Sequence, residues 1–174
     1  FFSELAARGT DLLVLDLRGN YGGTPPPTVE LLKYIINKPI PFFAEDNPFY
    51  LGKWKAPVQP APDAFDGKLY VLIDEAGFSM NSFLLSLLKY HGTGTLAGAR
   101  TSGGFKCSDA SRDAVLFNTG LRFRYSTEVF NTAVEGQEAG LGIAPDIEVK
   151  WTLEDYVEGR DPVLAAALDA GLKD

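Results

Sequence analysis

Two short glycine-containing segments have the residue types that chemistry at a peptide carbonyl requires. One is Arg18–Gly23, and the other is Gly77–Asn81, which reads Gly-Phe-Ser-Met-Asn. Ser79 precedes an apolar helical pattern, so its hydroxyl would lie at a helix N-terminus, beside unpaired N–H groups and in the positive end of the macrodipole. Adjacent glycines let backbone N–H groups point outward, as an oxyanion pocket needs. Serine is also an ordinary N-cap residue, so the motif alone leaves both interpretations open.

No histidine near Ser79 completes a hydrolase motif. In the Gly-x-Ser-x-Gly turn of α/β hydrolases a second glycine follows the serine, but Asn81 stands at that position. The one histidine, His91, lies twelve residues further along the same predicted helix. At about 1.5 Å per residue the separation is roughly 18 Å, too far for proton transfer. We therefore expect His91 to be a helix C-terminal residue.

Both segments follow apolar runs that predict buried strands. Residues 12–17 and 69–73 are apolar almost throughout, as strands of a parallel sheet are when both faces are covered. After a loop with three prolines at 25–27, residues 29–36 have helical spacing, and residues 80–91 form a second amphipathic pattern that ends before Gly92. Strand, loop and helix thus occur twice, and loops at the carboxyl ends of parallel strands lie at one edge of the sheet.

The rest of the chain predicts a β-rich second half. Strands are expected at 95–98, 114–117, 121–125 and 147–151, with a hairpin turn at 118–120 and a half-buried alternation in 121–125. Asp161 precedes Pro162 as the cap of a last helix. Residues 39–67 contain six prolines and predict an irregular excursion with short edge strands. The expected fold is one α/β domain over residues 1–174, with flanking helices.

Composition excludes several classes of function. The chain has 16 basic and 23 acidic residues, for a formal charge of −7, with one cysteine and one histidine. A disulfide scaffold and a Cys/His zinc site are excluded, although carboxylate metal sites are not. No basic cluster exists to bind a nucleic acid, and no apolar run approaches the roughly 20 residues of a membrane span. No cofactor or metal is implied.

Four segments in order carry a family resemblance. They are residues 13–23 (Leu-Val-Leu-Asp-Leu-Arg-Gly-Asn-Tyr-Gly-Gly), 71–79 (Val-Leu-Ile-Asp-Glu-Ala-Gly-Phe-Ser), 96–104 (Leu-Ala-Gly-Ala-Arg-Thr-Ser-Gly-Gly) and 142–149 (Gly-Ile-Ala-Pro-Asp-Ile-Glu-Val). Together they resemble the tail-specific or C-terminal processing peptidases, whose wider family includes the tricorn protease core. The resemblance implies a crotonase-like or ClpP-like α/β core and a serine endopeptidase acting on unfolded or tail-exposed polypeptides. It also implies that Ser79 is the nucleophile, with oxyanion donors from the N–H of Met80 and of Gly22 or Gly23.

The resemblance leaves the general base open. In the processing peptidases a lysine serves, and in register its place falls on Gly104, whereas Lys106 lies two residues later. Tricorn-like members use an upstream histidine and a glutamate near the closing strand, for which Glu138 and Glu135 are the candidates here. Retinoid-binding relatives lack the lysine. Lys106, an upstream histidine with a glutamate, and no competent base therefore all remain possible.

Further expectations concern the whole protein. The start without methionine suggests a piece of a longer chain, with an upstream domain that recognises substrate, and the piece alone is expected to be a poor peptidase. Family habit suggests an extracytoplasmic location, periplasmic or secreted. The walls of a specificity pocket are expected from residues 39–67 and from upstream, and Cys107 is expected to be incidental. The alternative is an inactive domain of the same fold that binds an apolar ligand or a peptide.

Overall fold

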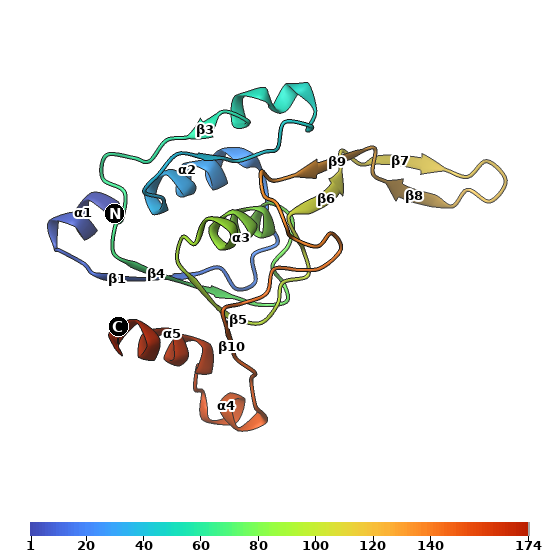
Figure 1. Cartoon of the computed structure of the whole chain (residues 1–174). Coiled ribbons are helices and arrows are strands. Elements are labelled where there is room, and N and C mark those ends of the chain that lie inside the picture. Colours follow the sequence, from blue (N-terminus) through green and yellow to red (C-terminus); the bar gives the residue numbers. More distant parts are fainter. Residues whose placement is uncertain (174) are drawn as a thin grey trace.

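A four-stranded parallel sheet forms the centre of the computed structural model, which describes residues 1–173 (Figure 1). Its order is β1-β4-β5-β10, with β1 at Leu12–Asp16, β4 at Lys68–Ile73, β5 at Thr95–Gly98 and β10 at Ile147–Glu148. The predicted α/β class is confirmed. Burial on both faces is confirmed for β4, but it is wrong for β1, which lies at the sheet edge and is only half-buried. β10 is shorter than the predicted strand.

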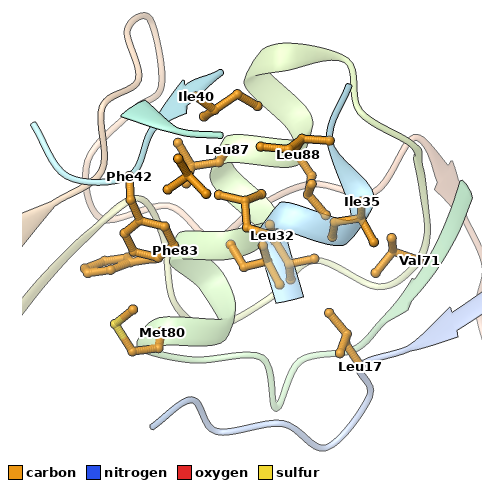
Figure 2. Packing of buried hydrophobic residues seen from close by; sticks show 14 of the residues in the cluster. Leu17, Leu32, Ile35, Ile40, Phe42, Val71, Met80, Phe83, Leu87 and Leu88 are labelled. Carbon is orange, nitrogen blue, oxygen red and sulfur yellow. The ribbon is translucent and has the colours of Figure 1, made fainter. Parts of the chain in front are cut away.

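Two helices cover one face of the sheet. The apolar side of α3 (Met80–His91) packs with α2 (Pro25–Ile35), and Figure 2 shows Leu32 and Leu88 in this core. Gly92 ends α3 in the left-handed conformation at φ 64°, as predicted. The prolines at 25–27 form the first turn of α2 rather than the predicted loop. First-turn residues lack an intrahelical N–H partner, so proline is tolerated there.

The opposite face of the sheet packs against α5 (Pro162–Lys173) (Figure 1). Val163 and Ala167 of this helix form one buried apolar cluster with Leu72 of β4. Asp161 caps α5 as predicted, because its carboxylate accepts the N–H of Leu164 at 3.0 Å. The short helices α1 (Phe2–Ala7) and α4 (Leu153–Glu158) lie near the beginning and end of the chain. Within residues 1–173, no helix has the length and apolarity to cross a bilayer.

The proline-rich excursion is irregular, as predicted. It contains the two-residue antiparallel strands β2 (Ile40–Pro41) and β3 (Pro57–Val58) and the 3₁₀ helix η1 (Phe49–Trp54). Its apolar residues, among them Phe42 and Phe43, belong to the same core as α2 and α3. The excursion is therefore part of the folded domain and not a linker.

A long antiparallel ribbon connects β5 to β10. Its base is β6 (Lys106–Asp109) paired with β9 (Glu128–Asn131), and its far end is β7 (Arg112–Val115) paired with β8 (Arg122–Tyr125). The predicted hairpin turn is confirmed. The predicted half-burial of residues 121–125 is wrong, because β7 and β8 extend away from the rest of the molecule and every residue of β8 is exposed (Figure 1).

Candidate active site

Ser79 lies in a strained turn between β4 and α3. Its backbone has φ 53° and ψ −128°, and a left-handed φ costs a non-glycine residue on the order of 1–3 kcal/mol. Ser79 occupies the N-cap position, yet its hydroxyl makes no capping hydrogen bond in the described chain. The ordinary N-cap interpretation is therefore wrong about the hydroxyl of this half-buried residue.

The loop after β1 is tied directly to this turn. The N–H of Gly19 donates to both carboxylate oxygens of Asp74, at 3.0 and 2.9 Å. The carbonyl of Asn20 accepts the N–H of Phe78 at 3.3 Å and the side-chain amide of Asn81 at 3.1 Å. Asn81, which disqualifies the α/β-hydrolase motif, is thus a brace between the two loops. The predicted meeting of the two glycine-containing segments is confirmed.

Gly22 touches the Ser79 turn so closely that no side chain fits. A Cβ atom at this position would lie 2.7 Å from the Met80 nitrogen and 2.8 Å from the Ser79 Cβ, and the backbone has φ 96°. The N–H of Gly22 donates to the side-chain oxygen of Asn20 at 2.8 Å. Among residues 1–173 the N–H of Gly23 has no hydrogen-bond acceptor, and Met80 contributes the first N–H of α3. Gly23 and Met80 therefore offer the free donors beside Ser79.

A third loop supports the turn from the β5 side. The N–H of Gly103 donates to the Gly77 carbonyl at 2.9 Å, and Ser102 donates to the Glu75 carbonyl through both its N–H and its hydroxyl. A Cβ atom on Gly104 would stand 2.5 Å from the Leu141 carbonyl oxygen. A lysine at the register position would therefore require this backbone to move.

Ser79 opens into an apolar cavity of about 240 Å³. Cys107 and Asp109 face the cavity from β6, and strand alternation turns the exposed Lys106 to the other side. Burial, with a smaller effect of the Asp109 charge, raises the pKa of the Cys107 thiol, so the thiol stays protonated at neutral pH. The other lining residues come from the loop after β1, the start of α2, the excursion, α3 and β9: Gly23, Thr24, Pro25, Phe43, Tyr50, Leu51, Met80, Phe83 and Phe130.

Hydrogen bonds fix the excursion beside this cavity. The buried side chain of Asn47 donates to the carbonyls of Ala44 and Asn131 and accepts the N–H of Asn131 at 3.0 Å. The hydroxyl of Tyr50 donates to Glu128 at 2.8 Å. Both contacts join the excursion to β9. These hydrogen bonds therefore hold the excursion against β9, and both segments form walls of the cavity.

Comparison with known proteins identifies the family. Residues 1–149 match the family model described as peptidase family S41. The chain belongs to this family of serine peptidases. The tricorn protease of Thermoplasma acidophilum is 30% identical over 172 residues, which cover 98% of this chain and 15% of that protein. This chain spans between 13% and 19% of the length of the four curated relatives that it matches.

Solved structures share the fold. A protein from Parabacteroides merdae ATCC 43184 superposes with a TM-score of 0.75 and 22% identity, over 98% of this chain and 55% of that chain. The photosystem II D1 C-terminal processing protease superposes with a TM-score of 0.60 and 22% identity, over 86% of this chain and 37% of that chain. The family match confirms the predicted resemblance, and these solved structures confirm the α/β fold.

The candidate bases and base partners of this S41 chain do not line the Ser79 cavity. Lys106 is exposed on the outer side of β6. Glu138 lines a separate cavity of about 190 Å³ with Arg100 and Lys89, and Glu135 is exposed. His91 is the last residue of α3, as predicted, and burial lowers its pKa, with a smaller contribution from Lys38. The sequence thus predicts the Ser79 turn, but none of the three residues that it offered as bases or as partners of a base lies beside Ser79.

Arg18 anchors the loop after β1. Its guanidinium is paired with Asp16 at 2.7 Å and with Asp161, the cap of α5, at 2.8 Å. Hydrogen bonds from Arg18 lower the pKa of both carboxyl groups. These contacts connect the glycine loop of the S41 site to the helix on the far face of the sheet.

Several cavity residues were missed from the sequence. Asp109 and Phe130 line the cavity because β6 and β9 pair as the base of the ribbon, and neither strand was predicted. The expectation that residues 39–67 form walls is confirmed by Phe43, Tyr50 and Leu51. Alternation on β6 was the one available signal, since it places Cys107 and Asp109 on a single face.

Proposed function

We propose that this chain is the catalytic core of an S41 serine endopeptidase with Ser79 as the acyl-forming nucleophile. The observation that carries the proposal is the conformation of Ser79, which is left-handed, without a capping bond and open to a cavity. Backbone strain of this kind persists where surrounding contacts enforce it, and it is concentrated at functional sites. The Asn20, Asn81 and Gly22 contacts supply that enforcement.

The proposed reaction is acyl transfer to serine followed by hydrolysis. The Ser79 oxygen bonds to the carbonyl carbon of the peptide while its proton passes to a base, and the carbonyl oxygen becomes negative. The N–H groups of Met80 and Gly23 stabilise this oxyanion, assisted by the α3 macrodipole. The C–N bond then breaks as the base returns the proton to the leaving amine. Water hydrolyses the ester and restores the hydroxyl.

We propose that the base comes from outside these residues. No lysine or histidine of residues 1–173 lines the cavity, and Gly104 has no room for a lysine side chain. For an active enzyme this leaves an upstream histidine, which Glu138 or Glu135 would orient from outside the Ser79 cavity. The 174-residue chain alone is then a poor peptidase, and the longer protein, with its own recognition domain, is the active form. The lack of any competent base would instead make the chain a binding domain.

The substrate that suits this site is an unfolded or tail-exposed polypeptide. The cavity of about 240 Å³ is smaller than the roughly 300–1,000 Å³ typical of small-molecule sites and suits one large apolar side chain. Exposed aromatic residues also stand next in sequence to cavity residues: Phe78 precedes Ser79, and Phe49 precedes Tyr50. A peptide must be extended to place one residue in the cavity and its carbonyl at Ser79.

Hydrolysis of an unfolded protein by the full-length protein tests the proposal, together with fluorophosphonate labelling of Ser79. We expect Ser79→Ala to abolish both hydrolysis and labelling, whereas Ser108→Ala, an exposed serine on β6, changes neither. Lys106→Ala and Asp109→Asn should retain most activity. Glu138→Gln or Glu135→Gln should reduce hydrolysis by about 10²–10⁴, the effect of disabling acid–base catalysis.

The results separate the alternatives. A loss of hydrolysis in Lys106→Ala as large as the loss in Ser79→Ala would identify a lysine base and contradict an external base. Hydrolysis that persists in Ser79→Ala would refute the nucleophile. The second candidate function, an inactive binding domain, is favoured by the lack of a lysine or histidine in the described part of the cavity. It would be supported by an intact protein that neither labels nor hydrolyses but binds apolar peptides.

A further inference from the structure

The far end of the ribbon is an unusually apolar surface with no partner. We call residues 112–125 the arm, which comprises β7, β8 and their turn and extends away from the domain (Figure 1). Phe117 at its tip is fully exposed, and the other exposed large apolar residues of the arm are Val115, Leu116, Leu121, Phe123 and Tyr125. Soluble proteins rarely expose so many neighbouring apolar side chains unless the surface binds something.

The charge of the arm differs from that of the remaining chain. Three arginines, Arg112, Arg122 and Arg124, stand against one acid, Asp113, so the arm has a formal charge of +2 in a chain of −7. Within the described residues, none of these arginines takes part in an ion pair. A partner of the arm should therefore carry apolar side chains and acidic ones.

The arm continues the wall of the Ser79 cavity. Cys107 pairs with Phe130 at the base of the ribbon, and both line the cavity. Arg112 pairs with Tyr125 in the same register further out. At about 3.3 Å per residue, the arm begins roughly 10 Å beyond Asp109 and reaches its tip after roughly 25 Å. A single extended polypeptide can span this path.

We propose that the arm is an exosite for the polypeptide substrate and binds an extended apolar segment with acidic residues while another residue of the same chain occupies the Ser79 cavity. This inference rests on the proposed function. The arm has only two strands, so each strand has an outer edge where the backbone of a substrate can add by β-augmentation. Apolar side chains and unpaired arginines then select which segments bind.

Direct binding to the Ser79→Ala protein tests the exosite without requiring turnover. The probe is a fluorescent 25-residue unfolded peptide of Gly, Ser and Asn with interspersed Leu, Phe and Asp, and a second peptide has Lys in place of Asp. We expect Phe117→Ser combined with Leu121→Ser to weaken binding at least tenfold, because two apolar contacts are lost. Arg122→Glu combined with Arg124→Glu should weaken the Asp peptide and favour the Lys peptide.

A matched control carries the same change at another exposed apolar surface. Leu153→Ser combined with Val157→Ser on α4 removes two exposed apolar side chains that lie outside the ribbon. This variant should bind both peptides as the parent protein does. A peptide of six residues, too short to reach from the cavity to the tip, should bind equally to the parent and to the variant with Phe117→Ser and Leu121→Ser.

The results distinguish the exosite from the proposed function and from self-association. Equal affinity of parent and arm variants for the long peptide would overturn the exosite, whatever Ser79 does. Arm-dependent binding in a protein whose Ser79 never labels would overturn the proposed function alone. Analytical sedimentation tests self-association. An oligomer that Phe117→Ser dissociates, with peptide affinity unchanged, would assign the arm to a second copy of the chain and refute the exosite.

Discussion

The Ser79 turn and the arm are both accessible to solvent, but they are built in opposite ways. The turn is held by hydrogen bonds from the loop after β1 and from the loop after β5, and Gly22 contacts it without space for a Cβ. The arm contacts mainly itself, through the pairing of β7 and β8. The turn holds one residue in a strained conformation, whereas the arm presents many exposed side chains on a two-stranded ribbon.

The difference between the turn and the arm matches the different requirements of a chemical reaction and of polypeptide binding. Acyl transfer needs the nucleophile and the oxyanion donors to be fixed to within a fraction of an ångström. Binding of an extended, variable polypeptide tolerates movement and needs mainly exposed apolar and charged surface. Substitutions in the turn should therefore affect activity and stability together, and substitutions in the arm should leave stability unchanged.

The largest expected effect is that of Gly22→Ala. The new Cβ would displace Met80 or Ser79 and so misplace an oxyanion donor, which should lower the acylation rate of Ser79 by about 10²–10³. Fluorophosphonate labelling of the full-length protein measures the rate. Gly52→Ala, whose Cβ would meet nothing within 4 Å, is the control and should label normally. Normal labelling of Gly22→Ala would contradict the close contact.

Asn81→Ala should have the next largest effect. It removes the amide that donates to the Asn20 carbonyl at 3.1 Å and to the Leu17 carbonyl at 3.5 Å. Loss of buried hydrogen bonds should lower the free energy of unfolding by about 1–3 kcal/mol, as measured by urea denaturation. Labelling of Ser79 should slow in the same variant. A destabilised protein that labels at the parent rate would show that Asn81 does not position the turn.

Arg18→Met should destabilise the protein by a smaller amount that depends on pH. Arg18 lowers the folded-state pKa of Asp16 and Asp161 below the unfolded value near 3.9. The resulting stabilisation is present above about pH 4 and is lost as the pH falls through the lowered folded pKa values. Urea denaturation at neutral pH should show a loss of about 1 kcal/mol for this partly buried pair.

The fall in the free energy of unfolding at acidic pH distinguishes the paired Arg18 from the unpaired arginines of the arm. Arg18→Met should flatten the fall in unfolding free energy below about pH 4, because the two aspartates no longer have lowered pKa values. Arg122→Met is the control from the arm and should retain the acid limb of the parent. The same slope in both variants would mean that the Arg18 pairs do not stabilise the fold.

The smallest expected effect on stability is that of Phe117→Ser. Its side chain is fully exposed, so the free energy of unfolding should change by less than about 0.5 kcal/mol. Urea denaturation checks this value, and an unchanged m value would show that the exposed surface is the same. Phe83→Ser, in the buried core beside the cavity, is the contrasting variant and should destabilise strongly. A large decrease in the free energy of unfolding of Phe117→Ser would show that the arm packs on the domain.

Sequence alone predicted the α/β core and the position of Ser79. The continuous apolar run of β4 and the helical spacing of apolar residues in α3 indicate burial from the sequence alone. Gly92 indicates the end of α3 because glycine readily adopts the left-handed conformation, and Asp161 indicates the start of α5 because aspartate caps helices. The order of four motifs also identified the family. These features depend on neighbouring residues, and local sequence therefore suffices to predict them.

Only the tertiary structure decided what surrounds the serine. Asn81 is a brace because Asn20, 61 residues away, turns its carbonyl toward it, and the cavity takes walls from β6, β9 and η1. The structure also left Lys106 and Glu138 outside the cavity and left residues 121–125 exposed despite their alternating pattern. Alternation predicts two different faces of a strand, but whether either face is buried depends on what packs against it, and distant parts of the chain determine that packing.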